Sequence, residues 1–156
     1  MNFKTFTAAA LLAAIGTGAA ADDRATVQAF YDLLSNPGSA KHAALFKEAT
    51  APDWESLGDY TGRAKTKAEF LGQMGGFAQL IPDLDWAVEA MHIADDTITV
   101  RSRATGTPVA PLFGVDGQGR SFDIMTIDIH EMEDGKIVRS YHVEDWAGAL
   151  QQLAAR

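Results

Sequence analysis

The spacing of the apolar residues changes at Pro82. Before Pro82 they recur every three or four positions, as on one face of a helix, and after it they alternate with polar residues, as in a strand. Strands that follow one another without intervening helices pair among themselves, so this order is typical of an α+β domain. We therefore predict helices that cover one face of a curved antiparallel sheet.

Three helices are expected in the first half of the chain. The first spans 22–35 and ends at an Asn-Pro-Gly sequence. Its apolar stripe consists of Val27, Phe30, Tyr31 and Leu34. The second spans about 40–49 and turns Leu45 and Phe46 inward. The third begins at Thr66, which opens the T-x-x-E pattern of a capping box.

Four strands and a final helix are expected in the second half. The strands span 84–90, 97–107, 122–132 and 136–144. The last two form a hairpin around Asp134-Gly135, because a tight turn that contains Gly is a common hairpin signal. Asp145 can cap the N-terminus of the final helix. The inward residues of that helix are Trp146, Leu150 and Leu153.

The first 21 residues have the pattern of a secretory signal peptide. Lys4 supplies a positive charge, residues 6–15 form an apolar run, and small residues lead to Ala19-Ala20-Ala21. The apolar run is shorter than the roughly 20 residues that cross a bilayer, although a buried N-terminal helix is an alternative interpretation. We predict a signal peptide at 1–21, one mature domain at 22–156, and a periplasmic or secreted location.

The charge and the cysteine content restrict the chemistry. The formal net charge is −8, from 13 basic and 21 acidic residues, so no basic surface is expected to hold a nucleic acid. The chain has 0 Cys, which excludes a thiol nucleophile, a thiolate metal site and a disulfide framework. Carboxylates, imidazoles and hydroxyls are the groups that remain for catalysis.

The hairpin admits two registers. A two-residue turn at Asp134-Gly135 would send the side chains of Asp128 and His142 to opposite faces. A three-residue turn with Gly135 in the left-handed conformation pairs Asp128 with Ser140 instead. We favour the second register, because it gathers the polar groups on one face. That face contains Phe122, Ile124, Thr126, Asp128, Val138, Ser140 and His142. The other face contains Met125, Ile127, Ile129, Arg139, Tyr141 and Val143.

Asp128 and His142 then become diagonal neighbours within side-chain reach. A carboxylate beside an imidazole orients the ring and raises its pKa, which makes His142 a candidate general base. A polar pair with a purely structural role is the alternative. A metal site is a further alternative, because His130 falls on the same face, but its spacing matches no known ligand pattern.

Several short motifs follow one another along the chain in a specific order. They are Ala51-Pro52-Asp53-Trp54, Ile81-Pro82-Asp83-Leu84, Gly106-Thr107, Phe113-Gly114, Asp134-Gly135-Lys136-Ile137, Asp145-Trp146 and Leu150-Gln151-Gln152-Leu153. In this order they resemble the SnoaL-like polyketide cyclases, also called ester cyclases, of the nuclear transport factor 2-like superfamily. The resemblance implies a cone-shaped α+β barrel with a hydrophobic pocket between sheet and helices, usually a dimer, and no cofactor.

The resemblance also bears on single residues. The family's cyclases use a pocket aspartate on the last strand as the acid/base of an aldol ring closure, and His142 stands at that position. Asp128 stands where the family has a pocket histidine, so the two residue types are exchanged in this chain. Asp145 matches the family's aspartate at the end of the last strand, and we interpret it as a helix cap.

The leading hypothesis is acid/base catalysis on a small apolar carbonyl compound, as an aldol-type cyclisation, an isomerisation, or the addition or removal of water. His142 would be the base, Asp128 the group that orients it, and Thr126 or Ser140 a hydrogen-bond donor. Further substrate contacts are expected from Ile124, Phe122, Trp54 and Phe70.

Two other functions use parts of the same fold. The pocket could bind an apolar ligand in the periplasm without turnover, or the second face of the hairpin could hold a dimer or another protein together. No nucleic acid, no metal and no membrane span are expected in any of these cases, and a homodimer is expected from the resemblance.

Overall fold

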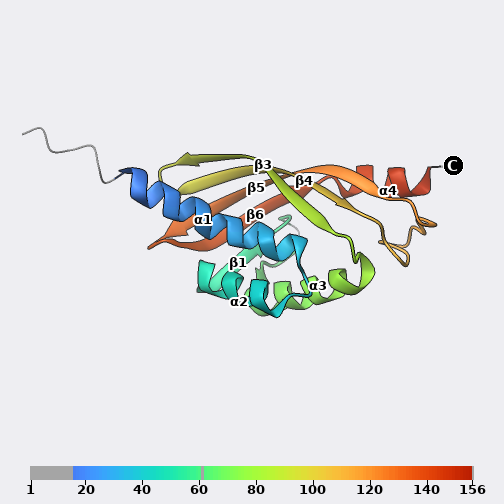
Figure 1. Ribbon diagram of the computed structural model, residues 1–156, viewed down its shortest axis with the longest axis horizontal. Coiled ribbons are helices and arrows are strands. Elements are labelled where there is room, and N and C mark those ends of the chain that lie inside the picture. Colours follow the sequence, from blue (N-terminus) through green and yellow to red (C-terminus); the bar gives the residue numbers. More distant parts are fainter. Residues whose placement is uncertain (1–15, 61, 156) are drawn as a thin grey trace, which may run out of the picture.

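The structure is a computed structural model that describes residues 16–60 and 62–155. Its helices and strands are, in chain order, α1 (Gly16–Ser35), α2 (Ala40–Ala49), β1 (Thr50–Leu57), β2 (Lys65–Thr66), α3 (Lys67–Leu80), β3 (Asp85–Ala94), β4 (Thr97–Gly106), β5 (Phe122–Glu133), β6 (Lys136–Glu144) and α4 (Trp146–Ala154). The strands form one curved sheet in the order β2-β1-β6-β5-β4-β3. Helices α1, α2 and α3 lie on one side of this sheet, and α4 lies near its far end (Figure 1). The predicted α+β architecture is therefore confirmed.

The helix caps follow the sequence signals. Thr66 caps α3 in a complete capping box with Glu69, and Asp145 caps α4 by accepting a hydrogen bond from the backbone N–H of Gly148. The prediction for α2 is half right, because Phe46 is fully buried whereas Leu45 is exposed. Within the described part of the chain, no helix combines the length and the apolar character needed to cross a membrane.

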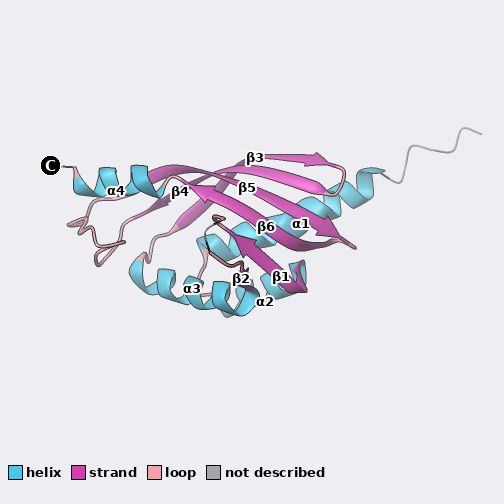
Figure 2. Cartoon of the chain, turned by 180° about the vertical axis from the view of Figure 1, so that it is seen from behind, coloured by secondary structure: helices cyan, strands magenta, loops and turns pink. Residues whose placement is uncertain are grey.

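Helix α1 begins at Gly16, six positions before the predicted start at residue 22. The boundary of the predicted signal peptide thus falls inside a helix, and residues 1–15 of that segment lie outside the described residues. Export and cleavage stay predictions. In the view from behind, the sheet lies in front of α1 (Figure 2), and four side chains of the predicted stripe are buried against it. They are Val27, Phe30, Tyr31 and Leu34.

Strand β1 is missing from the sequence prediction, which places its first strand at 84–90. It runs parallel to β6, while the other strand pairs are antiparallel. Its register shifts between Thr50 and Glu55, so buried positions alternate with partly buried ones only after Asp53. Without that alternation the segment has no strand signal. Its placement next to β6 brings Ser56 beside the predicted site.

The hairpin of β5 and β6 has neither of the two proposed registers throughout. Asp134 and Gly135 both have positive φ, at 49° and 71°, as in the two-residue turn that joins Glu133 to Lys136. A bulge then places an extra residue, Val138, in β6, and beyond it Asp128 pairs directly with His142. The favoured three-residue turn is therefore wrong.

The bulge brings the polar side chains of β5 and β6 back onto one face of the hairpin. Ile137 precedes the bulge, pairs with Met132 and is fully buried on the inner face. Val138 is the extra residue and is only partly buried, and Ser140 after it points inward again. Beyond the bulge the inner face carries Thr126, Asp128, His130, Ser140, His142 and Glu144. The outer face of the two strands is mostly apolar, as predicted.

Candidate functional site

A cavity of about 270 Å³ lies between the inner face of the sheet and helices α1 and α3. One side of it is apolar and includes Phe30, Leu34, Phe70, Met74, Phe77 and Trp86. Five polar side chains reach it from the sheet, namely Ser56, Lys65, Asp128, His142 and Glu144. A pocket with apolar walls and a few convergent polar groups is the usual form of a small-molecule site.

Asp128 is the most deeply placed acidic group of the cavity, with 2% of its surface exposed. Its Oδ2 accepts a hydrogen bond of 2.9 Å from the hydroxyl of Tyr31 in α1. Burial raises the pKa of Asp128 to about 7, and the charge of Glu144 adds to this, while the Tyr31 bond and His142 oppose it. Near neutral pH this carboxyl can therefore take up or release a proton.

A chain of hydrogen bonds runs from Asp128 away from the cavity. The Tyr31 oxygen lies 3.0 Å from Nε2 of His130, and Nδ1 of that ring lies 2.8 Å from the Ser140 hydroxyl. The Ser140 oxygen accepts a bond of 3.1 Å from the indole of Trp54. Burial lowers the pKa of His130 to about 3, so its ring is neutral and carries a single N–H.

The two ends of this hydrogen-bond chain determine which way its protons point. Trp54 can only donate, and Tyr31 donates to Asp128, so Nε2 of His130 must donate to Tyr31. Nδ1 then accepts from Ser140. Every proton in the chain therefore points towards Asp128, an order in which successive hydrogen bonds strengthen one another.

His142 is held by a different set of contacts. Its Nδ1 lies 2.8 Å from Oε1 of Glu144, and its Nε2 lies 3.0 Å from the hydroxyl of Ser56. A Cβ on Gly58 would come within 2.8 Å of the ring, so any larger residue at this position would displace the imidazole. The prediction that Asp128 orients His142 is wrong, because the carboxylate bonded to the ring is Glu144.

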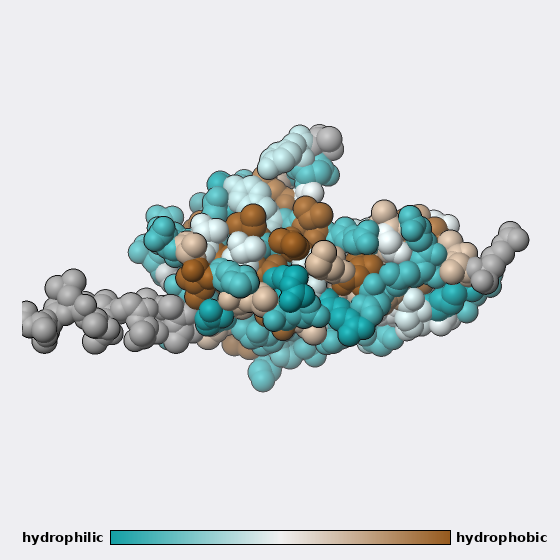
Figure 3. All heavy atoms as spheres, turned by 90° about the horizontal axis from the view of Figure 1, so that it is seen from above, coloured by the Kyte–Doolittle hydropathy of each residue, from teal (hydrophilic) through white to brown (hydrophobic). Residues whose placement is uncertain are grey.

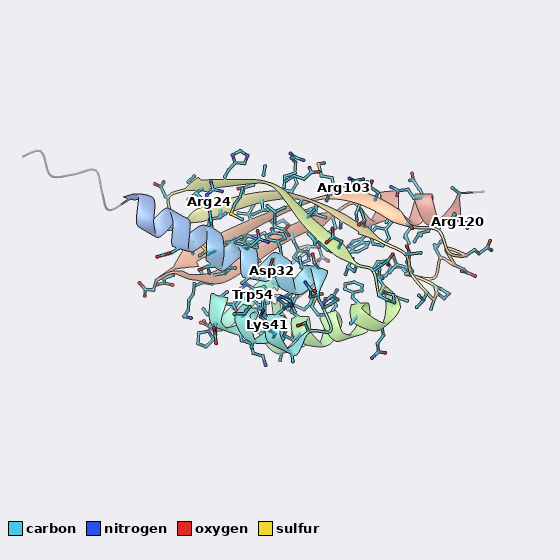
Figure 4. The ribbon with its side chains drawn as sticks, in the orientation of Figure 1. Arg24, Asp32, Lys41, Trp54, Arg103 and Arg120 are labelled. Carbon is cyan, nitrogen blue, oxygen red and sulfur yellow. The ribbon has the colours of Figure 1, made fainter. Side chains whose placement is uncertain are left out.

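Of the predicted substrate contacts, Phe70 lines the cavity and five others lie outside its lining. The Thr126 hydroxyl is bonded to Ser102 and to the indole of Trp86, and Ser140 belongs to the chain described above. The remaining three are fully or nearly fully buried in the core, namely Phe122, Ile124 and Trp54. Trp54 reaches from β1 to the rings of α1, α2 and α3 (Figure 4).

The sequence analysis missed four polar residues of the site, namely Tyr31, Ser56, His130 in its bridging role, and Glu144. Glu144 could have been found, because it lies two positions after His142 and so shares its face of the strand. The alternative of a metal site rests on His130. Both ring nitrogens of His130 are hydrogen-bonded, to Tyr31 and to Ser140. Residues 16–60 and 62–155 contain no group of three side chains that could hold a metal ion.

The family model of the SnoaL-like polyketide cyclases matches residues 25–153. Among solved structures, a protein from Jannaschia sp. CCS1 assigned as a SnoaL-like polyketide cyclase is 18% identical, with 87% of this chain and 94% of that chain covered and a TM-score of 0.74. TsrD from Streptomyces laurentii is 19% identical, with 87% and 97% covered and a TM-score of 0.74. IdmH from Streptomyces antibioticus is 23% identical, with 85% and 99% covered and a TM-score of 0.72. No curated protein matches the chain.

Proposed function

Because the chain belongs to the SnoaL-like polyketide cyclase family, we propose that its cavity binds a small apolar carbonyl compound and moves a proton from the carbon next to the carbonyl group. The observation that carries the proposal is Asp128, a carboxyl group in the wall of the cavity. Burial of this group raises its pKa to about 7. A base with a pKa near the working pH is the most effective catalyst of such a step.

In this mechanism Asp128 takes the proton and the substrate becomes an enolate. Tyr31 occupies Oδ2 of the carboxylate, so the proton goes to Oδ1. His142, when protonated, forms an ion pair with Glu144 and lies directly across the strands from Asp128, where its charge stabilises the enolate. Attack of the enolate carbon on a second carbonyl group gives ring closure, and return of the proton to another carbon gives isomerisation.

Proton exchange tests this proposal without knowledge of the natural substrate. In D2O the protein should speed the loss of the benzylic C–H signals of phenylacetone, followed by proton NMR. We expect Asp128→Asn to slow this exchange about a hundredfold, the lower range for loss of a general base. Asp123→Asn is the matched control, since Asp123 lies on the same strand but is exposed and paired with Arg103.

Two results would count against the proposal. Equal exchange by the wild-type protein and Asp128→Asn would remove Asp128 from the mechanism. Binding of phenylacetone and related aryl ketones without any exchange would favour a protein that binds an apolar ligand without turnover, the second function that this cavity supports.

We also propose that the outer face of β5 and β6 joins two copies of the chain. Four apolar side chains are exposed together on this face, namely Met125, Ile127, Ile129 and Val143, and hydrophobic residues gather on the surface of this side of the molecule (Figure 3). The strands can bury this face against its own copy in a two-fold arrangement.

A charge at the centre of this face is expected to separate the copies. Light scattering should give the mass of a dimer for the wild-type protein and of a monomer for Ile127→Lys, because a buried charge without a partner is costly. Gln79→Lys, on the exposed side of α3, should stay dimeric. A wild-type protein of monomeric mass would overturn this proposal.

A further inference from the structure

Ser56, His142 and Glu144 form a continuous line of hydrogen bonds along the wall of the cavity. The Ser56 hydroxyl lies 3.0 Å from Nε2 of His142, and Nδ1 of the same ring lies 2.8 Å from Oε1 of Glu144. All three side chains border the cavity. The three residues come from two strands that lie side by side, β1 and β6.

This order of groups is the one that activates a serine. A carboxylate bonded to Nδ1 keeps the proton on that nitrogen, so Nε2 is left with its lone pair facing the serine hydroxyl. The serine proton can then pass to Nε2 while the oxygen attacks. These distances and roles identify the three residues as a catalytic-triad arrangement. Such triads occur on unrelated folds, so the fold itself is no argument against one.

Two further features of the cavity suit attack on a carbonyl group. Lys65 pairs with Ser56 across β1 and β2, and its ammonium group, which donates a hydrogen bond of 2.8 Å to Oε1 of Gln73, brings positive charge to the same cavity. Gly58 presses against the His142 ring, which fixes the imidazole next to Ser56. The apolar walls supplied by α1 and α3 fit a short or aromatic acyl group.

We propose that Ser56 is a nucleophile and that this cavity hydrolyses small apolar carboxylic esters. Ser56 Oγ attacks the ester carbonyl carbon and its proton moves to Nε2 of His142. The bond to the alcohol oxygen breaks, and the alcohol leaves with the proton from His142. Water then attacks the acyl-serine and gives a proton to Nε2 of His142. The bond between the acyl carbon and Ser56 Oγ breaks, His142 returns the proton to Oγ, and the carboxylic acid leaves. This reaction goes beyond the proposed function, because it depends on Ser56 and not on a base at Asp128.

Covalent labelling gives the first test. Phenylmethanesulfonyl fluoride should add to the wild-type chain at Ser56, located by peptide mass spectrometry, and 4-nitrophenyl acetate should release a burst of one equivalent of 4-nitrophenolate. Ser56→Ala should abolish both signals, and Ser121→Ala, which removes an exposed serine, should change neither. An unlabelled Ser56 together with the absence of a burst would overturn the proposal. The exchange experiment with phenylacetone would still stand, since it requires no attack by Ser56.

A cysteine variant makes the test independent of the folding of Ser56→Ala. The chain has 0 Cys, so Ser56→Cys introduces a unique thiol beside His142. Iodoacetamide should alkylate this thiol at pH 6 about tenfold faster than it alkylates the thiol of the double variant Ser56→Cys, His142→Gln, because a neighbouring imidazole favours the thiolate. Adding Gly58→Ala to Ser56→Cys should slow alkylation as well, since it displaces the ring but keeps all three groups. Equal rates with and without His142 would show that position 56 is not activated, and the proposal would fail.

Discussion

At pH 8 the Asp128→Asn variant is expected to resist unfolding more than the wild-type protein, by at most about 4 kcal/mol. Burial raises the pKa of Asp128 to about 7 in the folded protein, whereas an unfolded chain has an aspartate pKa of about 3.9. The folded state therefore holds this proton more tightly, and stability falls as the pH rises from about 4 to 7, by about 1.4 kcal/mol for each unit of pKa difference. Asparagine avoids this loss, because it stays uncharged.

His130 has the opposite effect on stability. Burial lowers its pKa to about 3, against about 6.5 in an unfolded chain. The unfolded state binds more protons in this interval, so stability rises with pH between about 3 and 6.5, by at most about 5 kcal/mol. The two contributions oppose one another between pH 4 and 6.5. The wild-type protein should vary little in this range, whereas Asp128→Asn should become steadily more stable.

Urea unfolding followed by tryptophan fluorescence, repeated between pH 4 and 8, measures both effects. The difference between Asp128→Asn and the wild-type protein should be near zero at pH 4 and full at pH 8. The exposed Asp123 gives the control variant Asp123→Asn, because the bond from Arg103 lowers the pKa of this carboxyl, opposite in direction to Asp128. A difference between Asp128→Asn and wild type that does not change with pH would mean that Asp128 ionises without a burial penalty. The argument for Asp128 as a base of pKa about 7 would then fail as well.

The order of helices and strands could be predicted because its signals are local. Apolar spacing, the capping box at Thr66 and the cap at Asp145 each depend on residues within one or two turns of chain, and the structure contains all of them. The register of the hairpin depends on one extra residue in β6, Val138, in a stretch of strand-forming residues without glycine. Nothing in that stretch favours the bulge at one position over the next.

The site could be predicted only where it lies within the hairpin. Asp128 and His142 lie in the two strands of one hairpin, so the strand period leaves few registers to compare, and the requirement that polar groups share a face brings the two side chains together. Ser56 and Tyr31 come from parts of the chain 86 and 97 residues away from the groups they bond. Their contacts depend on the parallel pairing of β1 with β6 and on the packing of α1, and neither leaves a local pattern in the sequence.

Trp54→Ala is expected to lower the free energy of unfolding by about 3–5 kcal/mol, the range for removing a large buried aromatic side chain. Only 1% of Trp54 is exposed. Its ring lies 5.1 Å from that of Phe70, 5.2 Å from that of Phe46 and 6.2 Å from that of Phe30, measured between centroids. Truncation therefore removes contacts with three helices at once. Trp54→Phe keeps most of these contacts and should cost about 1–2 kcal/mol, mainly through the loss of the bond to Ser140.

A double-mutant cycle separates that bond from the packing. Ser140→Ala removes the hydroxyl that accepts from Trp54, so Trp54→Phe should cost about 1 kcal/mol less in the Ser140→Ala background than in the wild-type protein. Urea unfolding of the four proteins gives the coupling energy directly. Strictly additive effects would show that Trp54 contributes through packing alone. Coupling, in contrast, would support the assignment that every proton in the chain points towards Asp128, because the donor-only indole of Trp54 fixes the far end of that chain.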